Sequence, residues 1–142
     1  MNFEDATGYL VGEINQGLSC MFTMMNDARI GVACESVAIA ERAYQQALTY
    51  AKDRVQGEAH GQKGRTTIIH HPDVRRMLLK MRSQIEMMRV LVYVNTLELD
   101  LSEDDQGHSQ RADLLTPITK GWCSELCQEI TSIGLQIHGG MG

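Results

Sequence analysis

The longest uninterrupted feature of this sequence is a helical pattern from residue 18 to residue 56, which contains no proline. Gly31 is the only glycine inside it, and apolar residues recur three or four positions apart, as on one face of an α-helix. At about 1.5 Å per residue such a helix is about 55 Å long, a length typical of helical bundles. Small residues along it would let a neighbouring helix approach closely: Gly31, Ala33, Ala38, Ala40, Ala43 and Ala47.

Two more helical patterns follow the first. The second begins at His71-Pro72-Asp73, because proline suits the first helical position and an aspartate stabilises the first turn. Its apolar stripe fades near Leu101. The residues between the first two patterns, 57–69, are rich in glycine and charge and are predicted to form a loop.

The third pattern begins near Ser109, whose hydroxyl suits an N-cap, after an acidic loop at residues 102–107. Pro117 leaves two alternatives for this helix: a kink inside it, or a start at Pro117 with Thr116 as the cap. Both alternatives fit the apolar spacing that follows.

Three long helices joined by short loops predict an all-α fold, an antiparallel up-down helical bundle. The second helix carries apolar residues around much of its circumference, more than two neighbouring helices would cover. We therefore expect a missing fourth helix or a partner subunit against it. These apolar residues include Leu78, Leu79, Met87, Met88, Val90, Leu91 and Val92.

The composition narrows the class of function. The 142 residues are 43% hydrophobic and carry a formal net charge of −5, which argues against a disordered chain and against a general attraction to nucleic acid or anionic membranes. The sequence contains no apolar run of about 18 residues, and Met1-Asn2-Phe3-Glu4-Asp5 does not resemble a signal peptide. We expect a cytoplasmic protein that engages no membrane.

Cysteine and histidine give no sign of a metal site. Cys20, Cys34, Cys123 and Cys127 show no CxxC spacing and fit reduced thiols. Nucleophilic chemistry would need Cys20 or Cys34 to be exposed, so packing inside the helices is the favoured interpretation. The five histidines lie in no metal-binding motif, and no metal is predicted.

Two arginines are candidates for binding a ligand. Asn26 and Arg29 lie three residues apart on one helical face, where an amide and a guanidinium could grip a phosphorylated or amide-bearing ligand, or else face solvent. Arg54, near the end of the same pattern, could bind phosphate or offset the negative end of the helix.

The chain ends in a glycine-rich turn that contains Gly139, Gly140 and Gly142. Such a turn exposes backbone N–H groups and permits positive φ, as a loop needs when it approaches a phosphate or a planar ring closely. C-terminal capping of the third helix explains the same glycines. The turn is not a dinucleotide-binding fingerprint, since no strand precedes it and no helix follows.

Taken in order, these motifs resemble the C-terminal helical domain of the flavin-dependent acyl-CoA dehydrogenases, and the resemblance covers nearly the whole chain. Within that family the sequence is most similar to the branch that includes the bacterial 3-methylmercaptopropionyl-CoA dehydrogenases. The matching segments are Gly12-Glu13 through Gly17-Leu18, Asn26 with Arg29, residues 40–43, Arg54, His71 and residues 136–142.

The resemblance implies an FAD enzyme of fatty acid β-oxidation that oxidises an acyl-CoA thioester to its α,β-enoyl-CoA. It further implies an electron-transfer flavoprotein as partner and a homo-oligomer whose C-terminal domain is a four-helix bundle. Residues 1–17 would then be the remnant of the exit from a middle β-domain. Residues 18–142 would be a truncated bundle that lacks the fourth helix.

The resemblance also assigns roles to single residues. Asn26, where the family often has aspartate, and Arg29 match the positions that hold the CoA moiety. The positions that contact FAD, in part across a subunit interface, correspond to Arg54, Gln56, His71, Gln136, Gly139 and Gly140. Gln56 stands where the family commonly has phenylalanine.

The catalytic base is the main departure from the family pattern. Most members use a glutamate a few residues beyond the glycine turn, which here would lie beyond Gly142. Another branch uses a glutamate directly before the helix arginine, where this sequence has Ala28. We therefore expect this fragment to be inactive and to bind FAD weakly or not at all. The alternative is a free-standing helical interaction or oligomerisation module without catalysis.

Overall fold

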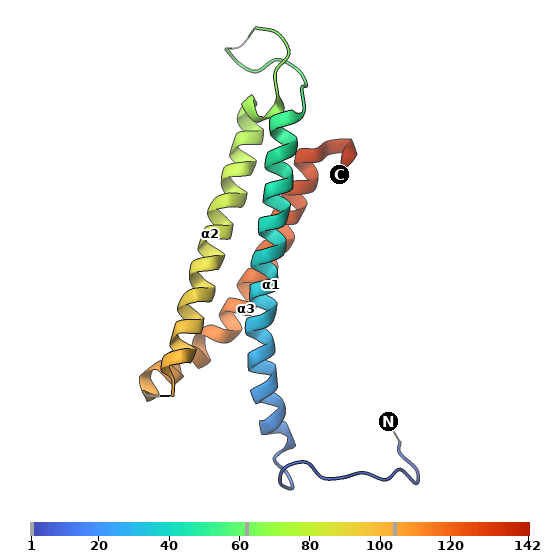
Figure 1. Cartoon of the computed structure of the whole chain (residues 1–142), viewed down its shortest axis with the longest axis vertical. Coiled ribbons are helices and arrows are strands. Elements are labelled where there is room, and N and C mark those ends of the chain that lie inside the picture. The colour runs from blue at the N-terminus through green and yellow to red at the C-terminus, as the bar shows by residue number, and fades with distance from the viewer. Residues whose placement is uncertain (1, 62, 104) are drawn as a thin grey trace.

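The computed structural model describes residues 2–61, 63–103 and 105–142, and within them the chain forms three long helices. They are α1 (Gly17–Asp53), α2 (Pro72–Leu101) and α3 (Gln106–His138), with short 3₁₀ turns η1 (Ile68–His70) and η2 (Gly139–Met141). Successive helices run in opposite directions, as Figure 1 shows, so the predicted all-α up-down bundle is confirmed. Met1, Gln62 and Asp104, in the predicted N-terminal remnant and loops, lie outside the described residues.

The core lies along the line where α1 packs against α3, with α2 covering both. On α1 the contact face is made of small side chains, because Ala33, Ala40 and Ala47 are all 0% exposed and lie seven residues apart. Seven residues are two helical turns, so these alanines form one seam that admits close approach of α3. The larger core side chains come from the partner helices: Leu78, Met81, Ile85, Met88 and Val92 from α2, and Cys123, Cys127, Ile130 and Ile137 from α3.

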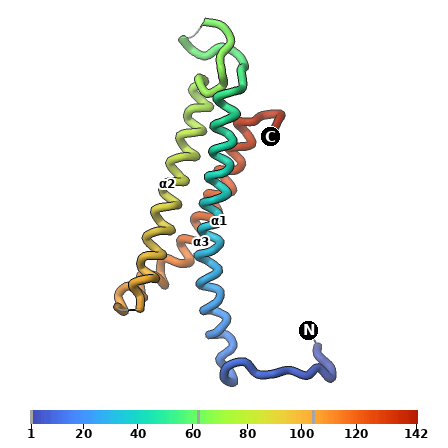
Figure 2. Tube along the Cα trace, viewed as in Figure 1, coloured from blue at the N-terminus to red at the C-terminus, as the bar shows by residue number. Residues whose placement is uncertain are grey.

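The N-terminal end of α1 and the segment before it extend away from α2 and α3 (Figure 2). Residues 7–12, within the predicted remnant of a β-domain, pair with no strand among the described residues, and Tyr9 and Val11 are about nine-tenths exposed. An isolated extended segment has no partner for its backbone groups, so its apolar pattern alone does not make a strand.

The end of α1 differs from the prediction, because the helix ends at Asp53 and not at Gln56. Arg54 is extended, with φ −73° and ψ 113°, and Val55 pairs with Thr67 in an isolated antiparallel bridge. The Gln56 amide also donates to the Thr66 carbonyl at 3.0 Å. These non-local backbone bonds draw the chain off the helix axis, and a local helical pattern does not reveal them.

The start of α3 corrects one expectation and decides between the two alternatives for Pro117. Asp105 is the N-cap, and its carboxylate accepts a hydrogen bond from the Gly107 amide at 2.8 Å, so Ser109 already lies inside the helix. Pro117 also lies inside α3, which removes the alternative of a start capped by Thr116. The start of α2 at Pro72 and its end at Leu101 agree with the prediction.

The outward side of α2 is apolar and exposed, as the sequence pattern predicted. We call Leu79, Met87, Val90 and Leu97 the outer face of α2; each is more than half exposed. Among the described residues no helix is both long and apolar enough to span a membrane.

Candidate functional site

A cavity of about 690 Å³ lies where the ends of all three helices meet, at the top of Figure 1. The end of α1, the start of α2 and the turn after α3 each supply one side of it. All six residues that the resemblance assigned to FAD line it: Arg54, Gln56, His71, Gln136, Gly139 and Gly140. The fold thus brings together three segments that are far apart in the sequence.

One wall of the cavity is fixed by the contact between the loop after α1 and the residue before α2. The His71 ring Nε2 lies 2.8 Å from the Gln56 carbonyl oxygen, which can only accept, so Nε2 carries the proton of this hydrogen bond. Gly57 has φ +70°, and a Cβ placed on it would lie 3.6 Å from the His71 ring. Glycine allows this left-handed turn, and the turn seats the imidazole against the loop.

The opposite wall is the glycine turn that follows α3. Gly139 has φ +61°, and its amide donates to the carbonyls of Gln136 and Leu135, which caps the helix. A Cβ placed on Gly139 or Gly140 would meet no atom within 4 Å, so this turn presents bare backbone to open space. Backbone of this kind lets a phosphate or a ring approach closely.

The charges around the cavity favour an anion. Arg54 is the cation on one side, and His71 and His138 add two imidazoles. None of the described residues that line the cavity is an aspartate or a glutamate. A guanidinium near a glycine turn without side chains fits the pyrophosphate of FAD, so the residues present suit that group.

The cavity residues that sequence reasoning did not assign include two aromatic ones, Tyr50 and His138. Tyr50 lies within the first helical pattern and His138 within the matching segment 136–142, but neither was assigned a role. Their positions carried a signal, because Tyr50 lies one helical turn before Arg54 and His138 directly precedes Gly139.

Asn26 and Arg29 lie elsewhere, in the first half of α1, and neither lines the cavity. Both are half-buried, and the Arg29 guanidinium Nη1 donates to the Asn26 side-chain oxygen at 2.8 Å. The predicted shared face is confirmed, and the amide holds the arginine in place.

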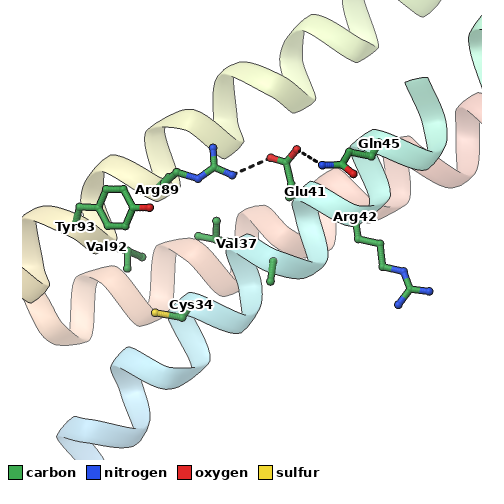
Figure 3. Close-up of a pocket in the computed structure, with 9 residues that line it drawn as sticks. Cys34, Val37, Glu41, Arg42, Gln45, Arg89, Val92 and Tyr93 are labelled. Atoms are coloured by element: carbon green, nitrogen blue, oxygen red, sulfur yellow. Dashed lines mark hydrogen bonds and ion pairs between the residues drawn. The ribbon is translucent and has the colours of Figure 1, made fainter. Parts of the chain in front are cut away.

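A second cavity, of about 510 Å³, lies between α1 and α2 and holds none of the predicted site residues (Figure 3). Its floor is apolar, and at one end the Glu41 carboxylate accepts hydrogen bonds from Arg89 and Gln45, each at 2.9 Å. The Gln45 amide and then the Arg89 guanidinium lower the pKa of Glu41. Arg42 points away from this cluster in Figure 3.

The cysteines divide into two classes. Cys20 and Cys34 are exposed, so the expectation that they pack inside the structure is wrong. Cys123 and Cys127 are buried in the core. Burial, with smaller contributions from Cys34 and Cys127, raises the pKa of Cys123 to about 11. Within the described residues no group of three or more His, Cys, Asp or Glu side chains could hold a metal ion.

The chain matches a known protein family over most of its length. Residues 15–142 match the family model for the acyl-CoA dehydrogenase C-terminal domain. The chain therefore belongs to the acyl-CoA dehydrogenase family, as predicted from its motifs.

Two relatives show how similar the chain is to longer proteins and how much of them it covers. Over its whole length the chain is 48% identical to 3-methylmercaptopropionyl-CoA dehydrogenase of Ruegeria pomeroyi and covers 25% of that protein. It is 30% identical, over 93% of its length, to the caffeyl-CoA reductase-Etf complex subunit CarC of Acetobacterium woodii and covers 31% of it. The chain thus spans about a quarter to a third of the relatives it matches.

A solved structure shows the same fold. The chain matches butyryl-CoA dehydrogenase of Megasphaera elsdenii with a TM-score of 0.75 and 28% identity. The match covers 91% of this chain and 30% of that one.

Proposed function

We propose that this chain is part of an FAD-dependent acyl-CoA dehydrogenase that oxidises acyl-CoA thioesters to α,β-enoyl-CoA, and that the cavity at the helix ends holds the FAD pyrophosphate. One observation carries the proposal: six residues assigned to FAD from the sequence line a single cavity. Family membership supports the enzyme over a free-standing interaction module.

Each wall of the cavity has its own part in binding. Arg54 neutralises phosphate charge, and the open Gly139–Gly140 backbone lets the phosphates approach. His71, held by the Gln56 carbonyl, shapes the remaining side. Bound FAD supplies a hydride acceptor for the oxidation, and the residues named here bind and orient it.

Asn26 and Arg29 are proposed to hold the CoA moiety. The hydrogen bond from Arg29 to Asn26 fixes the guanidinium, so less side-chain entropy is lost when it grips a phosphate or an amide of CoA. Asn26 keeps an acceptor oxygen where the family often has aspartate, without the negative charge.

A titration of the ¹⁵N-labelled chain with FAD tests the proposal. We expect weak, millimolar binding, seen as shifts of the Gly139 and Gly140 amides, because the chain carries only part of the binding surface. Arg54→Ala should weaken binding about tenfold or more. Arg42→Ala, an exposed arginine on the same helix outside the cavity, is the matched control.

The FAD titration and the turnover assay test different parts of the proposal. Absence of any FAD-dependent shift at the glycine turn, or equal losses in the two arginine variants, contradicts the assignment. In the same sample, a dye-coupled assay with acyl-CoA is expected to show no turnover, because Ala28 offers no carboxylate for proton abstraction. Turnover would overturn the expected inactivity of the fragment.

We further propose that the parent enzyme is a cytoplasmic homo-oligomer that passes electrons to an electron-transfer flavoprotein. The relative CarC is named as part of an Etf complex, which supports the electron partner. The exposed outer face of α2 supports self-association, since Met87, Val90 and the half-buried Trp122 also line a largely apolar groove between α2 and α3.

Self-association is expected for this chain in solution, because covering the outer face removes apolar surface from water. Light scattering should give a mass above that of the 15.9 kDa monomer. Val90→Lys should shift the mass toward the monomer, whereas Gln128→Lys, at an exposed position on α3, should not. A monomeric wild-type chain would count against the homo-oligomer.

A further inference from the structure

Two aromatic side chains that line the proposed FAD cavity meet there, one from the end of α1 and one from the end of α3. The rings of Tyr50, on α1, and His138, the last residue of α3, have centroids 4.6 Å apart and are tilted by 30°. Both side chains are half-buried and both line the cavity. At this separation and angle the two rings attract each other beyond the area that they bury.

The His138 ring is fixed by a second contact. Its Nδ1 lies 2.8 Å from the Gly134 carbonyl, and because a carbonyl only accepts, Nδ1 carries the proton. Gly134 is itself packed closely, since a Cβ placed there would lie 3.6 Å from Met81 Cε and 3.7 Å from the Ala43 Cβ. The last turn of α3 is therefore seated on the core just before His138.

The ring pair joins the two walls through the backbone. The Tyr50 carbonyl accepts a hydrogen bond from the Arg54 amide at 2.8 Å, so Tyr50 begins the turn that ends at the arginine. His138 directly precedes Gly139, where the chain reverses with φ +61°. A displacement of either ring would shift the guanidinium relative to the glycine amides.

We propose that Tyr50 and His138 are positioning residues, which set the spacing between Arg54 and the Gly139–Gly140 turn and so preorganise the cavity for phosphate. This inference rests on the proposed function, because it takes the cavity as the phosphate site. The rings need not contact the ligand: their effect on affinity comes from holding two walls at a fixed spacing.

Inorganic pyrophosphate is the probe, since it reports on the walls without any stacking base. We expect Tyr50→Ala and His138→Ala each to weaken pyrophosphate binding about fivefold, measured from the shifts of the Gly139 and Gly140 amides. Tyr50→Phe keeps the ring and should stay within about twofold of the wild type. Hydrogen exchange at the two glycine amides should accelerate in the alanine variants only.

Tyr44→Ala is the matched control, because Tyr44 is a half-buried tyrosine on the same helix that does not line the cavity. It should leave pyrophosphate affinity unchanged, and far-UV circular dichroism should show every variant folded. Two results would overturn the positioning role but not the phosphate site. One is an equal loss of pyrophosphate affinity in Tyr44→Ala and Tyr50→Ala, and the other is a Tyr50→Phe variant that binds pyrophosphate as weakly as Tyr50→Ala does. A wild-type chain that binds no pyrophosphate overturns the phosphate site, and this inference with it.

Discussion

Replacing Ala40 by leucine is expected to lower the free energy of unfolding by about 1–3 kcal/mol, the range seen when side chains are forced into a packed core. Ala40 is 0% exposed in the seam where α1 meets α3. A leucine there has no free volume to enter, so the helices must separate or the side chain must take a strained rotamer. Urea unfolding followed by far-UV circular dichroism measures the loss.

Ala38→Leu is the control for this substitution. Ala38 lies two residues earlier on α1 and is exposed, and alanine and leucine have similar helix propensities. The control variant should therefore unfold within about 0.5 kcal/mol of the wild type. If Ala40→Leu lowers the free energy of unfolding no more than Ala38→Leu does, α1 and α3 do not pack through their small residues.

The helices were predictable because their signals are local. Apolar spacing, the absence of proline from residue 18 to residue 56 and Pro72 at the first position of α2 act within a few residues of the structure they specify. Helix ends were harder to predict where non-local contacts decide them. The bridge between Val55 and Thr67 ends α1 early, and nothing near Asp53 in the sequence announces it.

The start of α3 is another end decided by distant residues. The Glu98 carboxylate on α2 accepts a hydrogen bond from the Arg111 Nε at 2.8 Å, and its Oε2 lies 2.7 Å from the His108 Nδ1. His108 and then Arg111 hold the pKa of Glu98 below its ordinary value. These contacts secure the first turns of α3 against α2, in addition to the N-cap that Asp105 provides.

The candidate site was predictable only through the family pattern. Arg54, His71 and Gly139 come from three different segments, and no spacing rule brings them together before the fold is known. Taken singly, the arginine and the glycines had structural explanations as good as the functional ones. Tyr50 and His138 escaped prediction for the same reason, since their significance lies in a contact between α1 and α3.

Thiol-specific reagents are expected to modify two cysteines in the native chain and all four after unfolding. Cys20 and Cys34 are exposed, whereas Cys123 and Cys127 are buried in the core. The thiolate is the reactive form, and with a pKa of about 11 the Cys123 thiol is about one part in a thousand ionised at pH 8. Mass spectrometry of the labelled protein counts the adducts, and Cys34→Ser should remove one native adduct. Four adducts in the native chain would contradict the buried core.

The same thiol is expected to make stability depend on alkaline pH. Because the folded-state pKa of Cys123 is raised from its ordinary value of 9.0 to about 11, its contribution to stability is complete below pH 9 and is lost as the pH rises toward 11. Titration of this one thiol changes the free energy of unfolding by at most about 1.4 kcal/mol per pH unit. Cys123→Ala lowers stability at every pH by opening a small cavity, so the informative quantity is the slope between pH 9 and 11. That slope should be shallower in the variant, and equal slopes would show that Cys123 titrates alike in the folded and unfolded chains.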